Sequence, residues 1–442
     1  MSRCDSDMKK FFVSVGLIAA GTASLQGAYA PEWNSMEASM WSISGTLRGF
    51  YDDNYTTASS GPNRGSLGFE VSPQINLNVP LQQTELGVRY TYGLYYYQER
   101  EDLGQNPIDQ SHQLDLWVDH AFTERWQAKV QDSFVMGQEP ELIDPNTSRP
   151  QRTEGNNISN TGTLAVNTIW TRLFSTALSY QNTIFDYQNS GGTDVDPSLA
   201  GELNRIDQSV SLDLQWRVAP ETVAFLGGAF EWVNYTGDEP IAINWTPYIR
   251  SLGSVPPGVF YSDSRNSRSY FGYVGVQRSM LANLSFTAKG GIQYSDNYND
   301  PSGATSLNPY ADISLIYTYL PGCYAQAGFT QTQNATDQVQ ADKYNGSIAM
   351  STESSTVYAS INHKLTPKLL GTVIGRWQHS VYNQGLFNNQ ADDYYSLGVN
   401  LSYSFTPHFS AEAGYNLDNV TSQIPENGYT RNRVYLGVTA AY

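Results

Sequence analysis

Charged residues recur at alternate positions of several segments in this chain, each time on the parity that otherwise carries polar residues. The set comprises Arg48, Glu70, Arg89, Asp115 and Lys129, then Asp213 and Arg217, and finally Glu412 and Arg433. Acidic and basic types alternate, which suits either of two roles. They could form cross-strand ion pairs that stiffen a sheet, or a transverse field that orients dipolar or charged solutes. We favour ion pairing, because a partner of opposite sign lowers the free-energy cost of removing each charge from water. The two roles can coexist.

The residues that usually carry catalysis do not form a recognisable arrangement. The five histidines are His112, His120, His363, His379 and His408, and none stands with a serine and an acid in a known pattern. The two cysteines, Cys4 and Cys323, do not form a cluster with histidine at the spacing of a metal site. The sequence therefore predicts neither an enzyme nor a site for a metal or other cofactor.

The charged positions belong to segments that alternate strictly between apolar and polar residues. In 209–218 the residues Val210, Leu212, Leu214 and Trp216 share one parity with Val218, and the other parity is polar. The segment 395–405 repeats the pattern. A period of two residues is typical of a β-strand with one apolar and one wet face.

The connections between these segments alternate between tight and long. Eight are tight, at 79–84, 122–125, 171–174, 219–222, 280–283, 320–323, 366–368 and 406–408. Nine long polar stretches rich in Gly, Asn, Asp and Pro separate them, which gives about eighteen strands with both termini on one side. Sixteen strands remain possible, because Val223 to Asn234 mixes its faces and Asp132 falls on the apolar parity. We expect a bulge or a shifted register at those two places.

This regularity predicts an all-β, up-and-down antiparallel barrel that spans a membrane. Outer-membrane barrels place tight turns in the periplasm and long loops outside, and a barrel of about 16 to 18 strands leaves an aqueous channel. A closed sheet also has no edge strand with unpaired backbone groups, and such groups cannot be exposed to the interior of a lipid bilayer. We therefore expect an integral protein of a bacterial outer membrane, with both termini in the periplasm.

Both ends of the chain fit export to that membrane. Lys9 and Lys10 precede the apolar run "FFVSVGLIAAG", and Ala28-Tyr29-Ala30 resembles a cleavage site, so 1–30 is predicted to be a signal peptide. The remainder, 31–442, is predicted to form a single barrel domain. The terminal "NRVYLGVTAAY" alternates and ends on Tyr442, which resembles the C-terminal signal read by the barrel-assembly machinery.

The net charge and the tyrosine content indicate which partners the chain can have. Removing Arg3, Lys9, Lys10, Asp5 and Asp7 with the signal from totals of 25 basic and 42 acidic residues leaves 22 and 40, a net charge of −18. Nucleic acid is therefore not an expected partner, and a pore should modestly favour cations. The 31 tyrosines suit the belts where rings meet lipid headgroups, so outer-membrane lipid is the expected environment. Assembly into a homo-oligomer stays open.

The longest connection, 234–268, carries apolar and aromatic residues that an exposed loop would not favour. Trp245 and Tyr248 are among those that need burial. The loop could fold into the barrel as a constriction, cap neighbouring loops, or contact another protomer. In the first two cases Asp238, Glu239 and Arg250 would face the path of a solute.

Three stretches resemble a known family of outer-membrane barrels. They are "GFYDDNYTT" (49–57), "DSFVMGQEPEL" (132–142) and the final "YTRNRVYLGVTAAY". Together they resemble the family described as putative beta-barrel porin, type 2. The resemblance implies a channel across the outer membrane but carries over no functional residue.

The function predicted from the sequence is passive diffusion of small hydrophilic solutes through a water-filled, mildly cation-selective pore. The alternative is a non-conducting structural or adhesive barrel whose long loops bind surface polymer or a partner. An open barrel predicts conductance, and a plugged one predicts none.

Overall fold

The structure of this chain is a computed structural model. It describes residues 40–59, 65–137, 157–251, 253, 258–281, 283–300, 303–336, 339–342, 344, 346–425 and 427–442. The predicted signal peptide and most of the connection 138–156 lie outside these residues, and so does the side chain of Tyr248.

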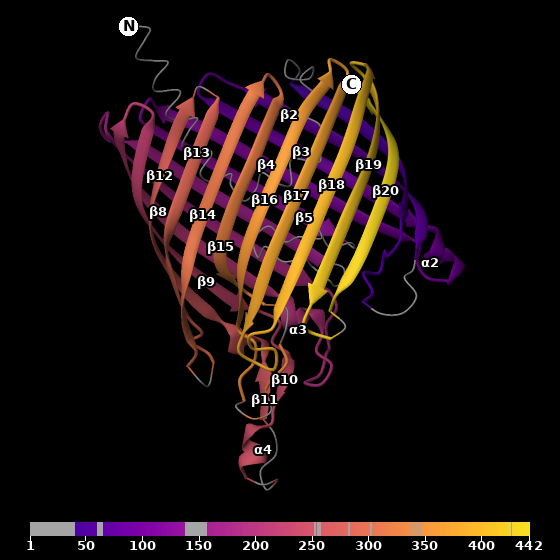
Figure 1. The fold of residues 1–442 in the computed structure, drawn as a ribbon, viewed down its shortest axis with the longest axis vertical. Helices are drawn as coiled ribbons and strands as arrows, with labels where there is room; N and C mark the ends of the chain where they lie inside the picture. Colours follow the sequence, from indigo (N-terminus) through magenta and orange to yellow (C-terminus); the bar gives the residue numbers. More distant parts are fainter. Residues whose placement is uncertain are drawn as a thin grey trace.

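Eighteen antiparallel strands form one closed sheet (Figure 1). In chain order they are β1 (Trp41–Asp52), β2 (Ser66–Pro80), β3 (Thr84–Tyr97), β4 (Ile108–Thr123), β5 (Trp126–Gly137), β6 (Asn157–Ile169), β7 (Phe174–Tyr187), β8 (Arg205–Ala219), β9 (Thr222–Tyr235), β12 (Ser267–Leu281), β13 (Leu284–Asp296), β14 (Thr305–Leu320), β15 (Cys323–Asn334), β16 (Ser351–Thr366), β17 (Leu369–Asn383), β18 (Ala391–Thr406), β19 (Phe409–Ser422) and β20 (Tyr429–Ala441). Each strand pairs with its neighbours along the chain, and β1 also pairs with β20. The predicted barrel is confirmed, with eighteen strands rather than sixteen.

The two ends of the barrel differ in the length of their connections. All eight predicted tight turns are present, and they join β2 to β3, β4 to β5 and so on to β18 and β19. Tyr442 exchanges backbone hydrogen bonds with Ile43, and Ala441 donates to His408 of a tight turn, so β20 ends at the tight-turn end of the barrel. The long connections lie at the other end.

Short elements occupy the long connections. They are α2 (Gln98–Asp102), α3 (Leu199–Leu203), the hairpin β10 (Pro240–Asn244) and β11 (Gly258–Tyr261), α4 (Thr246–Arg250) and the 3-10 helix η2 (Ser262–Arg265). The hairpin and α4 extend beyond the barrel, with α4 furthest from it (Figure 1). None of the helices in the described residues is long and apolar enough to cross a membrane.

The two faces of the wall have the predicted chemistry. On β1, Ile43 and Leu47 are about half exposed on the outer face, whereas Ser42 faces inward and is buried. A lipid-facing barrel requires this distribution, because its apolar side chains pack against acyl chains instead of a protein core. Alternation along the strand places the whole polar set on the inner face.

Aromatic rings gather at the tight-turn end of the outer face. Trp41 lies 5.6 Å from Tyr442, and Trp126 lies 5.7 Å from Trp170, measured between ring centroids. Amphipathic rings at one level of a barrel are typical of the lipid headgroup region. The last residue of the chain therefore belongs to this belt.

The bulge predicted near Asp132 is absent, and along Val223 to Asn234 the register shifts only beside the tight turn, between Arg217 and Ala219 of β8. Strand β5 pairs with β6 in unbroken register, and β9 does so with β12. Asp132 stays on the outer face, where the Asn160 amide donates to its carboxylate at 3.0 Å. The faces of β9 mix because apolar Phe225 and Val233 point inward and are buried by their neighbours, not because the strand changes register.

Candidate pore wall

An ion-pair ladder crosses the seam where the barrel closes. Arg48 stands directly opposite Glu70 of β2, and Arg48 Nη1 lies 3.1 Å from Glu70 Oε1. The Nε of Arg48 donates to Glu412 Oε1 at 2.5 Å, although β20 lies between β1 and β19. One guanidinium is therefore shared by carboxylates from both sides of the seam.

Gly437 makes the longer of these contacts possible. It is the residue of β20 opposite both Arg48 and Glu412. A Cβ at this position would lie 2.7 Å from Arg48 Cγ and 3.1 Å from Glu412 Oε1, closer than unbonded atoms pack. The absence of a side chain leaves the passage through which Arg48 reaches β19.

We predict that Gly437→Ala weakens the seam by about 1–3 kcal/mol, because the new methyl group displaces the Arg48 side chain. The measurement is denaturant unfolding of the barrel in lipid vesicles, followed by tryptophan fluorescence. Gly45→Ala is the matched control, since a Cβ there meets no atom within 4 Å. Equal stability of the two variants would show that the Arg48 contact to Glu412 contributes little.

The ladder continues on the next strands. Arg89 of β3 is in register with Asp115 of β4, and its Nε donates to Asp115 Oδ2 at 2.9 Å. Asp115 also accepts from the Ser133 hydroxyl at 2.7 Å. Lys129 lies on the inward parity of β5, opposite Asp119. The structure thus brings most of the charges predicted for the first strands into ion pairs.

A second charged group lies on the far side of the ring, on β8 and β12 to β14. The Tyr273 hydroxyl donates to Asp213 Oδ1 at 2.7 Å, and Lys289 Nζ lies 3.3 Å from Asp312 Oδ2. Arg217 shares the inward parity of Asp213 on β8. Sequence reasoning found Asp213 and Arg217 but missed Tyr273, Lys289 and Asp312. These three residues lie on the inward parity of their strands, which was the available signal. Glycines next to Tyr273 and Lys289 made the alternation of apolar and polar residues hard to recognise there.

Arg433, predicted as a wall charge without a named partner, belongs to a separate cluster of charged residues. It lies near the loop end of the seam, where its Nε donates to Asp52 Oδ2 at 2.9 Å and its Nη2 donates to the Tyr97 hydroxyl at 3.0 Å. Arg431 donates to the same oxygen of Asp52 at 2.7 Å. Glu412 pairs with Arg48, so the two charged residues predicted for the last two strands belong to different groups.

The long connection 236–266 forms a cap on neighbouring loops. Ile241, Ala242 and Phe260 of its hairpin pack in a buried cluster against three residues of the connection between β15 and β16, namely Val339, Ile348 and Met350. Trp245 precedes α4, which contains Tyr248 and ends at Arg250, so these three lie at the end of the molecule beyond the barrel (Figure 1). Asp238 and Glu239 precede the hairpin. A role for these five residues in the solute path stays a prediction.

Glu239 connects the cap to the loop after β7. Its carboxylate accepts from the Ser198 hydroxyl at 2.5 Å and from the backbone N–H groups of Gly191 and Gly192 at 3.0 and 3.1 Å. The Ser198 hydroxyl, followed by these N–H groups, holds the pKa of Glu239 below its ordinary value. The ionised form is therefore the one that joins the two loops.

We predict that this connection weakens in acid. Because the folded pKa is lowered, its contribution is fully present above the ordinary pKa of 4.5 and is lost as the pH falls through the lowered value. Protease cleavage of the loop 188–204 should therefore rise as the pH falls below 4.5, whereas Glu239→Gln should show raised cleavage already at neutral pH and little further change. Equal cleavage of the wild type and Glu239→Gln at neutral pH would contradict the assignment.

Arg265 anchors the same cap on the side that faces the barrel. Its side chain is buried, and its guanidinium donates to the backbone oxygens of Glu202 and Thr336, the latter at 2.7 Å. The guanidinium carbon also lies 4.1 Å from the centroid of the Tyr235 ring. One side chain thus joins α3, η2 and the connection after β15.

A closed antiparallel barrel with an apolar outer face, an aromatic belt and charged inner walls defines an outer-membrane β-barrel protein of the porin type. The chain belongs to the family described as "Putative beta-barrel porin 2", whose model matches residues 42–442. It is thus an integral outer-membrane protein that contacts lipid, and barrels of such a family typically have no enzymatic activity.

Solved channel structures are similar in outline. OccAB4 of Acinetobacter baumannii is 12% identical, with a TM-score of 0.42 over 92% of this chain and 100% of that one. OccK9 (OpdG) of Pseudomonas aeruginosa is 10% identical, with a TM-score of 0.45 over 91% of this chain and 98% of that one. Similarity at this level does not indicate a shared solute. No curated protein matches the chain.

Proposed function

We propose that the protein is a channel for passive diffusion of small hydrophilic solutes, with a modest preference for cations. The observation that carries this proposal is the pair of charged groups on facing inner walls of a barrel in a porin family. A wall that only sealed the barrel would not need charges on both sides, because each inward charge costs desolvation unless water or a partner compensates it.

The expected preference for cations follows from the local balance of charge. Arg48 is shared by two carboxylates, so the seam group carries a net charge of −1 when both are ionised. On the far side of the barrel, Lys289 is the one cation beside Asp213 and Asp312 in the described part of the chain. This second group therefore also has a net charge of −1. A cation passing between the walls is attracted by both, and an anion is repelled.

The proposed orientation places the tight turns and both termini of the chain in the periplasm and the capped loops outside. Tyr442 then lies where the assembly machinery would read the last strand. Apart from such transient partners and lipid, a homo-oligomer is compatible with this orientation. No chemical step is needed for transport, which is consistent with a non-enzymatic barrel.

The test is electrical. Mature protein refolded into planar bilayers should give steady current steps, and in a gradient of potassium chloride its reversal potential should have the sign of cation selectivity. A reversal potential of anionic sign would contradict the charge argument. Folding is verified separately by the shift in gel mobility between unheated and boiled samples.

The cap favours a second candidate, a non-conducting barrel whose loops bind surface polymer or a partner. The buried cluster of the hairpin and the connection after β15 gives those loops a fixed shape. A correctly folded but electrically silent barrel would support this candidate and overturn the channel.

A further inference from the structure

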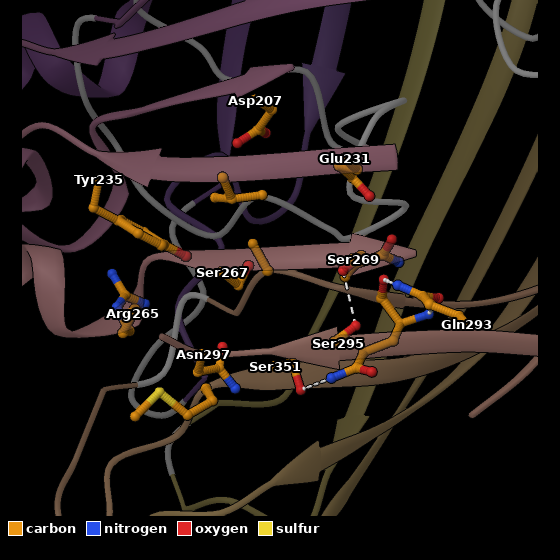
Figure 2. Close-up of a pocket in the computed structure, with 15 residues that line it drawn as sticks. Asp207, Glu231, Tyr235, Arg265, Ser267, Ser269, Gln293, Ser295, Asn297 and Ser351 are labelled. Atoms are coloured by element: carbon orange, nitrogen blue, oxygen red, sulfur yellow. Dashed lines mark hydrogen bonds between the residues drawn. The ribbon is translucent and has the colours of Figure 1, made fainter. Parts of the chain in front are cut away.

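Polar side chains are expected on the inner wall of the barrel, where they can pair across neighbouring strands. Figure 2 shows an example in a small pocket beneath the cap, which encloses only about 40 Å³ and is lined by Glu231 and Asn334 among others. The hydroxyls of Ser269 and Ser295 lie 2.8 Å apart there, on adjacent strands. Polar side chains on the outer wall need a different explanation, and β5 to β8 carry a group of them.

A polar patch lies on the outer wall of these four neighbouring strands. It consists of Asp132 on β5, Asn160 on β6, Asn182 on β7 and Gln208 on β8. Gly162 stands in register between Asp132 and Asn182, and Gln208 stands opposite Asn182. Alternation places all four side chains on the outer face, because they share the parity of exposed apolar residues on their strands, namely Val130, Leu164, Leu178 and Val210.

The patch interrupts the apolar band of the barrel. On each of the four strands, outward residues on both sides of the patch are apolar or aromatic. They are Val130 and Phe134 on β5, Ile158 and Leu164 on β6, Tyr180 and Ile184 on β7, and Ile206 and Val210 on β8. In an isolated barrel the polar groups would therefore lie among side chains that contact acyl chains. On β18, by contrast, every outward residue from Tyr395 to Tyr403 is apolar or aromatic.

One chain satisfies these groups only in part. The Asn160 amide donates to both oxygens of Asp132 at 3.0 Å, and a carboxylate can accept further bonds. The Asn182 amide has a single long contact, 3.5 Å from Nδ2 to the Tyr180 hydroxyl. The Gln208 amide forms no hydrogen bond within the part of the chain that the structure describes. Acyl chains offer no hydrogen bonds, so exposure of these groups to lipid is unfavourable.

The patch is complementary to itself under two-fold symmetry. A two-fold axis along the membrane normal, outside the barrel and opposite the boundary of β6 and β7, brings β5 of one copy to β8 of the other and β6 to β7. The Asp132 carboxylate then faces the Gln208 amide, and the amides of Asn160 and Asn182 face each other. Each pair combines a donor with an acceptor. Gly162 leaves space at the centre, because a Cβ there would meet only Asp132 Oδ1, at 3.6 Å.

We propose that a second copy of this chain covers the patch, so that two barrels form a dimer in the membrane through β5 to β8. The occupant of a patch within the apolar band must itself lie in the membrane and must offer hydrogen-bonding groups at the same depth. A second copy meets both conditions, whereas acyl chains meet only the first. The dimer does not depend on the proposed channel function, since the interface lies on the outer wall.

Cross-linking of single cysteines tests which side of the barrel faces the second copy. In a Cys323→Ser background, Val195→Cys places an exposed thiol on the loop between β7 and β8, and Leu386→Cys places one on the loop between β17 and β18, across the closed sheet. Folded protein in lipid vesicles is treated with a short bifunctional maleimide. We expect about 10-fold more covalent dimer from Val195→Cys than from Leu386→Cys. Equal yields, or no dimer from either, would overturn the proposal.

Removal of the polar groups tests whether they hold the two copies together. Adding the three substitutions Asp132→Leu, Asn182→Leu and Gln208→Leu to the Val195→Cys protein makes its outer wall uniformly apolar. The barrel should still fold, and the yield of covalent dimer should fall about 10-fold. Asn419→Leu is the matched control, because it replaces an outward amide on β19, far from the patch, and should leave the yield unchanged.

An undiminished dimer yield in the triple variant would overturn the role of the polar patch. The difference in gel mobility between unheated and boiled samples verifies that each variant has folded. The same proteins distinguish this proposal from the channel. Dimers of an electrically silent barrel would retain the interface and reject the channel, whereas conductance from protein that does not cross-link would retain the channel and reject the interface.

Discussion

Replacing Arg48 by methionine is expected to destabilise the barrel by about 3 kcal/mol and to make the pore more selective for cations. The substitution leaves Glu70 and Glu412 without their shared cation, and their side chains are only 11% and 6% exposed. Removing one partner of a buried ion pair costs about 3–5 kcal/mol, and contact with lumen water places this case at the lower end. Denaturant unfolding in vesicles measures the stability, and the reversal potential measures the selectivity.

The control variant also removes the two carboxylates that Arg48→Met leaves without a cation. The triple variant Arg48→Met, Glu70→Gln, Glu412→Gln should recover much of the lost stability and should lose the added cation preference. A single variant within about 0.5 kcal/mol of the wild type would mean that the ladder behaves as exposed ion pairs do. In that case the charges would act on solutes and not on the wall.

Replacing Arg265 by methionine is expected to release the cap while the barrel stays folded. The backbone oxygens of Glu202 and Thr336 would lose charged donors in a buried place, at a cost of about 3 kcal/mol. Because those oxygens belong to the connections and not to the barrel ladder, the loss should appear as local opening. Limited proteolysis should cut 199–204 and 335–350 much faster, with unchanged gel mobility of the remaining barrel.

Arg250→Met is the matched control for this experiment. Arg250 is an exposed arginine at the end of α4, beyond the barrel, so its loss should leave the cleavage pattern of the wild type. Equal cleavage of the Arg265→Met variant and the wild type would contradict the role of Arg265 as an anchor. The apolar cluster around Ile241 and Ile348 would then suffice to hold the cap.

The barrel itself was predictable because two independent patterns agree in this sequence. Alternation assigns faces, as in 395–405, and the order of tight and long connections assigns sides of the membrane. Neither depends on contacts between distant residues, so both are readable from a single chain. The eighteen strands and the eight tight turns are confirmed on this basis.

Pairings across the wall were less predictable, because they depend on register. Arg48 reaches Glu412 only through the gap at Gly437, and no rule of spacing indicates a contact that crosses an intervening strand. Likewise, no rule of spacing indicates that Arg433 pairs with Asp52. The bulge expected at Asp132 was wrong because an outward carboxylate can be satisfied by an adjacent outward amide, here Asn160.

The contacts of the cap and the pocket beneath it could not be predicted, although capping of neighbouring loops was one of the three alternatives for 234–268. Ile241 and Ile348 meet because two long connections fold against each other, and long connections carry little periodicity from which to predict their contacts. Glu231 and Asn334 come from β9 and β15, and only closure of the sheet brings them to one pocket. The apolar composition of 234–268 was the one available signal, and it indicated burial without indicating the partner.

The most direct test asks whether the polar face of the wall lines a water-filled path for ions. Thr46 and Leu47 are neighbours on β1, and Thr46 contacts Thr439 on the inner face while Leu47 is 52% exposed on the outer face. In a Cys323→Ser background, each is replaced by cysteine, and single channels are recorded while a charged, membrane-impermeant thiol reagent is added. We predict that the current through Thr46→Cys channels changes in steps and that Leu47→Cys channels are unaffected. Channels that respond at Leu47 and not at Thr46, or a folded barrel with no current, would contradict the account.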